Sequence, residues 1–134
     1  MSQMFVNLPV TDLDRSVTFF ERLGFSFDPN FTDDKATCMI VGGDAFVMLL
    51  NEEFFKTFTN KPVAEATEET EVIIGVSADS RDEVDRIVDA AMTAGADSAK
   101  PPVEGGGMYS RSFADPDGHT WEVIHMDMSK AAAA

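Results

Sequence analysis

The sequence is poor in the residues that most often build metal and redox sites. Its 134 residues include one cysteine, Cys38, and two histidines, His119 and His125. A single cysteine excludes an internal disulfide and a zinc site built on cysteines. We expect Cys38 to be a small buried apolar residue. With only two histidines, a metal held mainly by imidazole groups is not expected either.

Basic residues are also scarce. Ten Lys and Arg stand against 24 Asp and Glu, which gives a formal net charge of −14. Such a chain repels phosphate backbones, so no nucleic-acid partner is expected. The same charge would attract cationic small molecules to a cleft, although an acidic composition also simply favours solubility.

Long apolar runs are absent as well. No run approaches the roughly 20 residues that a membrane-spanning helix requires, and no signal-like stretch follows Met1. We therefore expect a cytoplasmic protein without a membrane partner. The length corresponds to about one domain.

What is present is an ordered series of strand and helix patterns in residues 1–60. An apolar strand is predicted over residues 4–10, and Thr11 is the expected cap of a helix that ends at Gly24. Two further strands, 38–41 and 45–50, are separated by a glycine-containing turn that favours a hairpin.

The second half repeats this order. A strand over residues 72–76 is followed by a helix that begins after Ser80, with Glu83 completing a capping box, and ends at Gly95. Two more strands, 108–114 and 120–126, flank the turn 115–118, whose Asp-Pro-Asp-Gly sequence favours a tight reversal. Each half thus shows three clear strands and one helix in the same order, and we interpret it as a β-α-β-β-β module with one further short strand, so that the whole is an α+β protein.

The boundaries follow from this repeat. We expect a first module at residues 1–60, a linker at 61–70, a second module at 71–128 and a tail at 129–134. Phe54, Phe55 and Phe58 predict a short helix or flap at the end of the first module. The glycine-rich segment 104–107 lacks the ending of a phosphate-binding loop and is interpreted as a flexible connection.

Two motifs resemble the vicinal oxygen chelate superfamily, which includes glyoxalases, bleomycin and fosfomycin resistance proteins and extradiol dioxygenases. Leu-Pro-Val-Thr-Asp-Leu-Asp-Arg-Ser-Val at residues 8–17 is similar to its opening, and Phe-Ala-Asp-Pro-Asp-Gly-His-Thr-Trp-Glu-Val at 113–123 to its closing hairpin. The resemblance covers residues 4–127. It implies cup-shaped mixed sheets of the glyoxalase/bleomycin resistance fold, with a small-molecule site in a cup between the modules, and a homodimer.

The resemblance also implies four metal-ligand positions, which fall on Phe5, Met48, Glu71 and Glu122. A hard divalent cation requires carboxylate or imidazole ligands, which Phe5 and Met48 do not provide. Glu71 and Glu122 are therefore only weak metal candidates, and no tightly bound metal or other cofactor is expected.

Glu122 is the candidate catalytic residue, as a general base. The resemblance implies that it faces the cup, and strand parity then places His125 on the opposite side of the sheet. If residues 115–118 form a tight turn, Arg111 lies opposite Glu122 and either pairs with it or binds an anionic substrate. The candidate substrate-binding residues are Phe5, Asn7, Phe46, Met48 and Arg111.

These observations leave four functions open. One is an interaction or scaffold protein that has kept the fold and lost the site, and the other three involve a small-molecule ligand. The first is a glyoxalase-like protein that binds or transforms a small molecule without a tightly bound metal, as a lyase, isomerase or dioxygenase-like enzyme if it is active. The second is a metal-free binding protein of the bleomycin-resistance type for a cationic aromatic ligand. The third is a metal-dependent enzyme resembling lactoylglutathione lyase.

Overall fold

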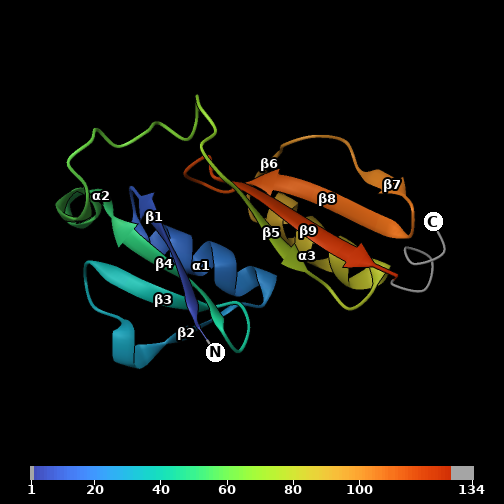
Figure 1. The fold of residues 1–134 in the computed structure, drawn as a ribbon, viewed down its shortest axis with the longest axis horizontal. Coiled ribbons are helices and arrows are strands. Elements are labelled where there is room, and N and C mark those ends of the chain that lie inside the picture. The colour runs from blue at the N-terminus through green and yellow to red at the C-terminus, as the bar shows by residue number, and fades with distance from the viewer. Residues whose placement is uncertain (1, 128–134) are drawn as a thin grey trace. The chain divides into compact units, whose positions relative to one another are not determined.

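The structure is a computed structural model that describes residues 2–127 (Figure 1). The chain divides into two units, one ending at Glu65 and the next beginning at Ala66. The expected tail at 129–134, with its four terminal alanines, lies outside the described residues. Within the described part of the chain, no helix is both long and apolar enough to span a bilayer.

The first unit is a four-stranded mixed sheet covered by one long helix. Its strand order is β1-β4-β3-β2, with β1 parallel to β4 and the other neighbours antiparallel. The elements are β1 (Met4–Val10), α1 (Leu13–Leu23), β2 (Ser26–Asp28), the 3-10 turn η1 (Pro29–Phe31), β3 (Ala36–Ile40) and β4 (Ala45–Asn51).

Helix α1 begins one residue later than the sequence predicted. The expected cap, Thr11, is wrong, because Asp12 is in the extended conformation and its carboxylate accepts a hydrogen bond from the Arg15 amide. A carboxylate at this position also interacts favourably with the positive end of the helix dipole. The predicted end is confirmed: Gly24 adopts a φ of 102°, which L-residues rarely reach.

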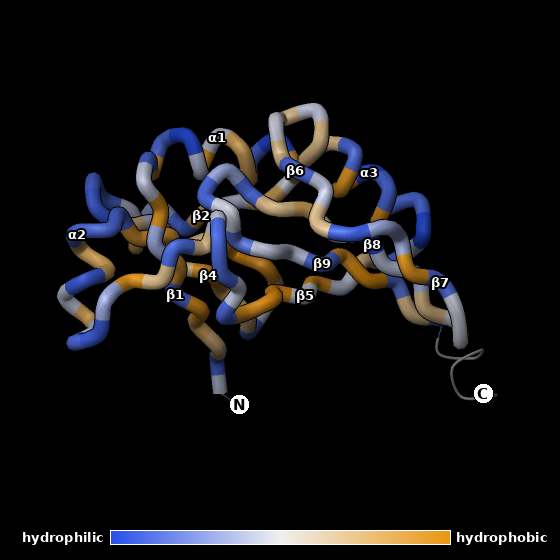
Figure 2. Tube along the Cα trace, turned by 90° about the horizontal axis from the view of Figure 1, so that it is seen from above, coloured by the Kyte–Doolittle hydropathy of each residue, from blue (hydrophilic) through white to orange (hydrophobic). Residues whose placement is uncertain are grey.

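The two faces of the first sheet differ in character. Leu8, Val10, Val47 and Leu49 are all at most 4 % exposed and lie on the face that α1 covers. The strand neighbours of these residues point the other way, onto what we call the first cup face, formed by Phe5, Asn7, Phe46 and Met48. Helix α1 carries both hydrophobic and hydrophilic residues along its length (Figure 2).

The predicted flap is a short helix, α2 (Glu52–Phe55), continued by the 3-10 turn η2 (Lys56–Phe58). Asn51 caps α2 by accepting a hydrogen bond from the Phe54 amide at 2.8 Å. Helix α2 packs against β1 and β4. The ring of Phe58 meets that of Phe54 edge-on, but Phe58 is 67 % exposed, so the flap buries its phenylalanines only in part.

The second unit repeats the plan of the first. Its strand order is β5-β9-β8-β6, with β7 also paired to β8 and β5 parallel to β9. The elements are β5 (Ile73–Ser77), α3 (Arg81–Thr93), β6 (Asp97–Ser98), β7 (Val103–Gly105), β8 (Met108–Ala114) and β9 (Thr120–Met126). Together the units confirm the predicted α+β architecture.

Helix α3 forms where its capping box and apolar spacing predicted. The Ser80 hydroxyl accepts a hydrogen bond from the Glu83 amide at 3.0 Å. The helix packs against β8 and β9. Its buried residues are those predicted from the sequence: Val84, Ile87, Val88 and Ala91.

The glycine-rich segment forms a hairpin rather than the flexible connection predicted. Residues Val103–Gly105 are strand β7, which pairs antiparallel with β8, and Gly105 lies opposite Met108. Gly106 and Gly107 have φ values of 61° and 82°. Three successive glycines allow the chain to reverse with positive φ values that other residues disfavour.

The loop between β8 and β9 is organised by a buried carboxylate, that of Asp115, which is 6 % exposed. One carboxylate oxygen accepts hydrogen bonds from the amides of Asp117 and His119, at 2.9 and 3.0 Å, and the other accepts one from the Trp121 indole at 2.9 Å. Burial raises the pKa of the Asp115 carboxyl, although these hydrogen bonds and the neighbouring His119 oppose the shift.

We expect Asp115→Ala to destabilise the protein by about 3 kcal/mol or more, because three N–H donors would lose their acceptor in a buried site. Asp115→Asn should cost less, since its amide oxygen can still accept from the two backbone amides. Asp34→Ala, at an exposed loop position, is the control and should change little. Urea denaturation at pH 7 measures all three.

The raised pKa gives this prediction a pH dependence. The folded state holds the Asp115 proton more tightly than the unfolded state, so the contribution of this group to stability falls as pH rises from 3.8 through its folded pKa. The stability of the wild type relative to Asp115→Asn should therefore decrease across that interval. A difference that is constant or rises with pH would contradict the assignment.

Candidate functional site

Glu122 stands in a row of three residues across the second sheet. In the strand register, Gly75 of β5 and Ser112 of β8 lie on either side of Glu122 on β9. These residues, with Ile73, Thr120 and Ile124, form the second cup face, which is the face away from α3. Gly75 has no side chain, and the end of the Ile124 side chain lies over it, 3.5 Å from where a Cβ atom would stand.

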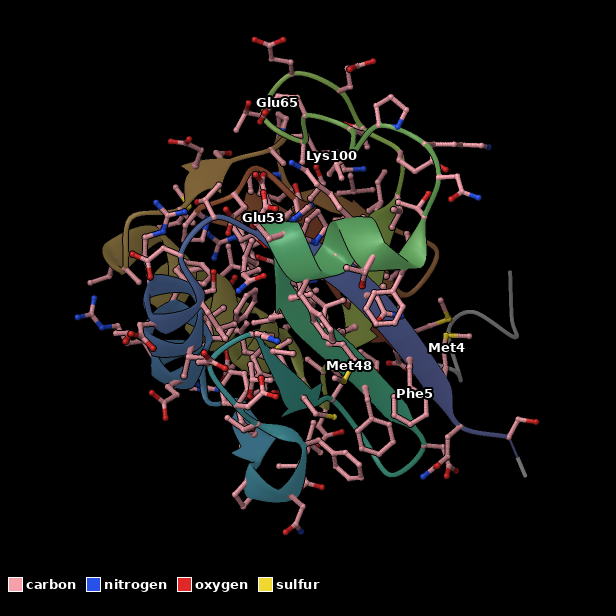
Figure 3. All side chains as sticks on the ribbon, turned by 90° about the vertical axis from the view of Figure 1, so that its left-hand side faces the viewer. Met4, Phe5, Met48, Glu53, Glu65 and Lys100 are labelled. Carbon is pink, nitrogen blue, oxygen red and sulfur yellow. The ribbon has the colours of Figure 1, made fainter. Side chains whose placement is uncertain are left out.

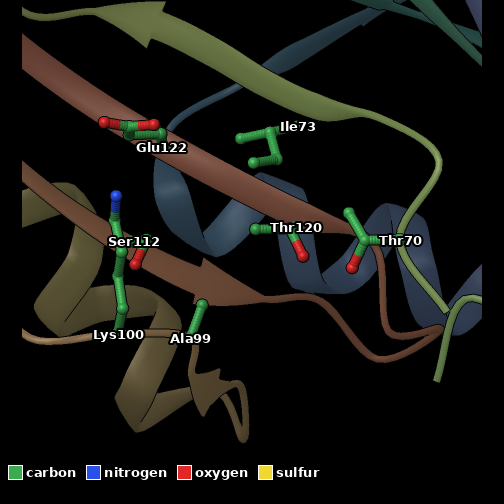
Figure 4. A pocket seen from close by; sticks show the side chains of 7 residues that line it. All are labelled: Thr70, Ile73, Ala99, Lys100, Ser112, Thr120 and Glu122. Carbon is green, nitrogen blue, oxygen red and sulfur yellow. The ribbon is translucent and has the colours of Figure 1, made fainter. Parts of the chain in front are cut away.

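A pocket of about 230 Å³ opens on this face (Figure 4). Glu122 and Lys100 bring one carboxylate and one ammonium group to it. In Figure 4 these two charged groups lie at the same end, with Ser112 beside Lys100, and Thr70 lies at the opposite end. The lining residues are Thr70, Ile73, Ala99, Lys100, Ser112, Thr120 and Glu122.

Three polar side chains of this pocket lack an ion-pair or hydrogen-bond partner within the described residues. Within residues 2–127, Glu122 and Lys100 form no ion pair and no side-chain hydrogen bond. Ser112 is 5 % exposed, and its hydroxyl is buried with no hydrogen-bond partner in the described part of the chain. Buried hydroxyls are nearly always hydrogen-bonded, so the orphaned Ser112 hydroxyl points to a ligand or a water molecule.

The predicted pairing of Arg111 with Glu122 is wrong. Arg111 lies opposite Val123, and its guanidinium donates to Asp85 and Asp89 of α3, each at 2.9 Å. It therefore lies on the helix side of the sheet, away from the pocket. The support for Arg111 as a substrate-binding residue is lost with this geometry.

The cause is one extra residue in the loop. A tight turn at 115–118 would pair Ala114 with His119, but the structure pairs Ala114 with Thr120. The His119 amide bonds to the Asp115 carboxylate, and the His119 carbonyl accepts from the Asp115 amide at 2.9 Å. A register shift of one residue exchanges the two faces of a strand, so Ser112 takes the place expected for Arg111.

The expected register turned Ser112 to the helix side of the sheet, so Ser112 was not predicted as a pocket residue. Lys100 was missed for another reason: it follows the two-residue strand β6 in an irregular segment, where no periodicity indicates its direction. Thr120 could have been found, because it precedes Glu122 by two residues on the same strand and therefore shares its face.

The remaining predicted binding residues lie in the first unit. Phe5 and Phe46 stack with ring centroids 5.1 Å apart and an angle of 16° between the rings. In Figure 3, Phe5 and Met48 both lie on the side of the first sheet that is turned to the viewer. Asn7 is opposite Met48 in the register and is exposed. The first cup face is thus mainly apolar and aromatic, with Phe5 51 % exposed.

The predicted metal positions do not fit a metal. Glu71 lies before β5 in an exposed bend, outside the strand and the pocket. The register shows that Ile73 is the second-unit counterpart of Phe5. Phe5 pairs with Phe46, two residues before Met48, and Ile73 pairs with Thr120, two residues before Glu122. Of Phe5, Met48, Ile73 and Glu122, only Glu122 carries a ligand suited to a hard cation.

No group of three or more His, Cys, Asp or Glu side chains is placed to hold a metal ion among residues 2–127. His125 is turned to the helix side of β9, as predicted, where its Nδ1 lies 3.0 Å from the Ala78 carbonyl oxygen. Cys38 is 2 % exposed and buried as expected.

Several solved structures resemble this chain. The hypothetical protein SA1046 from S. aureus is 28 % identical, with a TM-score of 0.79 over 93 % of this chain and 94 % of that one. A glyoxalase/bleomycin resistance protein/dioxygenase family enzyme from Burkholderia phytofirmans is 17 % identical, with a TM-score of 0.77 over 95 % and 100 %. The bleomycin resistance determinant of transposon Tn5 is 20 % identical, with a TM-score of 0.65 over 95 % and 99 %.

A comparison with curated protein sequences returned no significant match. The family model for the Glyoxalase/Bleomycin resistance protein/Dioxygenase superfamily matches residues 3–123, which is nearly the whole described chain. The match agrees with the paired modules, and the chain belongs to this superfamily.

Proposed function

We propose that this protein binds a small organic molecule at the Glu122 pocket without a tightly bound metal. The observation that carries the proposal is a half-buried carboxylate that lines a pocket of about 230 Å³ and has no partner among residues 2–127. A partly desolvated carboxylate without a partner is a strong acceptor for a ligand N–H, O–H or cation. Small-molecule binding is also common to the superfamily.

Glu122 is also the residue that could act in a reaction. A carboxylate that lines a pocket and has no partner among residues 2–127 can accept a proton from a substrate C–H or O–H, which is the step that an isomerase or lyase requires. A metal-dependent reaction of the lactoylglutathione-lyase type has less support. It would require ligands that Phe5, Met48 and Ile73 cannot provide.

A ligand screen by thermal shift in EDTA tests this function. At least one compound should raise the melting temperature of the wild type, because a ligand at about 100 times its Kd stabilises the fold by about 2.7 kcal/mol. The shift should disappear in Glu122→Gln and remain in Glu21→Gln, an exposed change on α1. Bound compounds should also move the NMR signals of Ser112 and Thr120.

Metal content is measured on the same protein. After incubation with Ni²⁺, Zn²⁺ or Mn²⁺ and dialysis, elemental analysis should find far less than one metal ion per chain. One tightly held ion per wild-type chain, lost in Glu122→Gln, would overturn the proposal in favour of the metal-dependent enzyme.

A second candidate is a binding protein for cationic aromatic ligands. The stacked and exposed Phe5–Phe46 pair favours it, since flat aromatic rings and a net charge of −14 both attract a planar cation. Proflavine fluorescence should then change on binding, and Phe5→Ser should weaken binding at least tenfold. Phe31→Ser, at another exposed phenylalanine, is the control. Equal affinity of the Phe5→Ser and Phe31→Ser variants for proflavine would exclude the first cup face as the binding site.

We also propose a homodimer. Met4 and Phe5 are 65 % and 51 % exposed on β1, which ends the order of the first sheet. Exposed apolar groups on a terminal strand favour pairing with another copy. Light scattering at micromolar concentration should give twice the chain mass, and Phe5→Lys should reduce it. A wild-type mass of one chain would reject the dimer.

A further inference from the structure

Two opposite charges share one end of the Glu122 pocket. Lys100 extends from the segment after β6 toward the strand that carries Glu122, and both groups line the cavity (Figure 4). They nevertheless form no ion pair. A carboxylate and an ammonium group that face one cavity without touching can each bind the opposite charge of a single ligand.

Ser112 adds an independent observation at the same end. Its hydroxyl is buried without a partner in the described residues, although a hydroxyl can both donate and accept a hydrogen bond. Because Ser112 is opposite Glu122 and lines the pocket with Lys100, a ligand carboxylate bound by Lys100 would lie next to Ser112, where rotation about its Cα–Cβ bond would bring the buried hydroxyl to the ligand.

The size of the pocket limits the ligand. A volume of about 230 Å³ lies below the roughly 300–1,000 Å³ of sites for drug-sized molecules. The rest of the lining offers the hydroxyls of Thr70 and Thr120 and the methyl groups of Ile73. This lining fits a short side chain that carries a polar group.

We propose that the pocket binds a small free α-amino acid, an inference that rests on the function proposed above. The α-ammonium group binds Glu122, and the α-carboxylate binds Lys100 and Ser112. An α-amino acid carries both charges on one carbon, which matches the position of Glu122 and Lys100 at one end of the pocket. The short side chain extends toward Thr70 and Thr120. A simple cation or anion would leave one of the two protein charges without a partner.

The test uses isothermal calorimetry with three related probes. L-Serine carries both charges, L-serine methyl ester only the positive charge, and N-acetyl-L-serine only the negative charge. L-Serine should bind the wild type at least tenfold more tightly than either derivative. Glycine, L-threonine and L-asparagine, measured in parallel, cover the other short side chains.

Two variants, each of which removes one charge, separate the contact at Glu122 from the contact at Lys100. Glu122→Gln should weaken L-serine and its methyl ester at least tenfold and leave N-acetyl-L-serine unchanged. Lys100→Gln should weaken L-serine and N-acetyl-L-serine and leave the ester unchanged. Lys61→Gln, an exposed change in the linker, should leave all three affinities as in the wild type. Circular dichroism melting curves check that each variant is folded.

Each other outcome counts against the proposal. Equal affinity for L-serine and one of its derivatives would show that one charge contact is absent. If none of the amino acids binds but a screened compound still binds through Glu122, the amino-acid proposal is wrong and the function proposed above stands. If no compound of either kind depends on Glu122, both fail.

Discussion

The geometry of the second sheet depends on the buried carboxylate of Asp115. Its hydrogen bonds to the amides of Asp117 and His119 hold a five-residue loop between β8 and β9. The bond from the Trp121 indole joins that loop to the fully buried side of β9. Since alternate residues of a strand face opposite sides, this loop length decides that Ser112, not Arg111, stands beside Glu122.

The two sides of the second sheet have different chemistry as a result. On the helix side, Tyr109 and Arg111 both donate to Asp85, and these hydrogen bonds hold the pKa of that carboxyl below its ordinary value. Arg81 stacks over the Tyr109 ring, 4.1 Å from its centre. Charges there are paired with one another and fasten α3 to the sheet. On the cup side, Glu122 remains available to a ligand.

Most of the architecture could be predicted because it depends on local patterns. The period of apolar residues gives the strands and the buried face of α3, and Ser80 and Gly24 mark helix ends by their capping chemistry. These signals need no knowledge of distant contacts. Strand parity alone also places Glu122 and His125 on opposite faces of β9.

The pocket could not be predicted in the same way, because it depends on which distant residues meet. The register of β8 against β9 turns on a side chain, Asp115, that bonds within its own loop, and a turn pattern alone does not show the extra residue, His119. Lys100 comes from a segment without regular periodicity. Glu71 was placed by resemblance, but β5 begins two residues beyond it.

The fold and the site respond to different constraints, which explains how one architecture supports different chemistry. Trp121 and Val123, both fully buried, hold β9 in the core, whereas their neighbour Glu122 faces the pocket. A replacement on the cup face therefore changes what can bind without removing core packing. An unpartnered carboxylate beside an unsatisfied buried hydroxyl is unfavourable for stability, and proteins retain such groups chiefly where a ligand completes them.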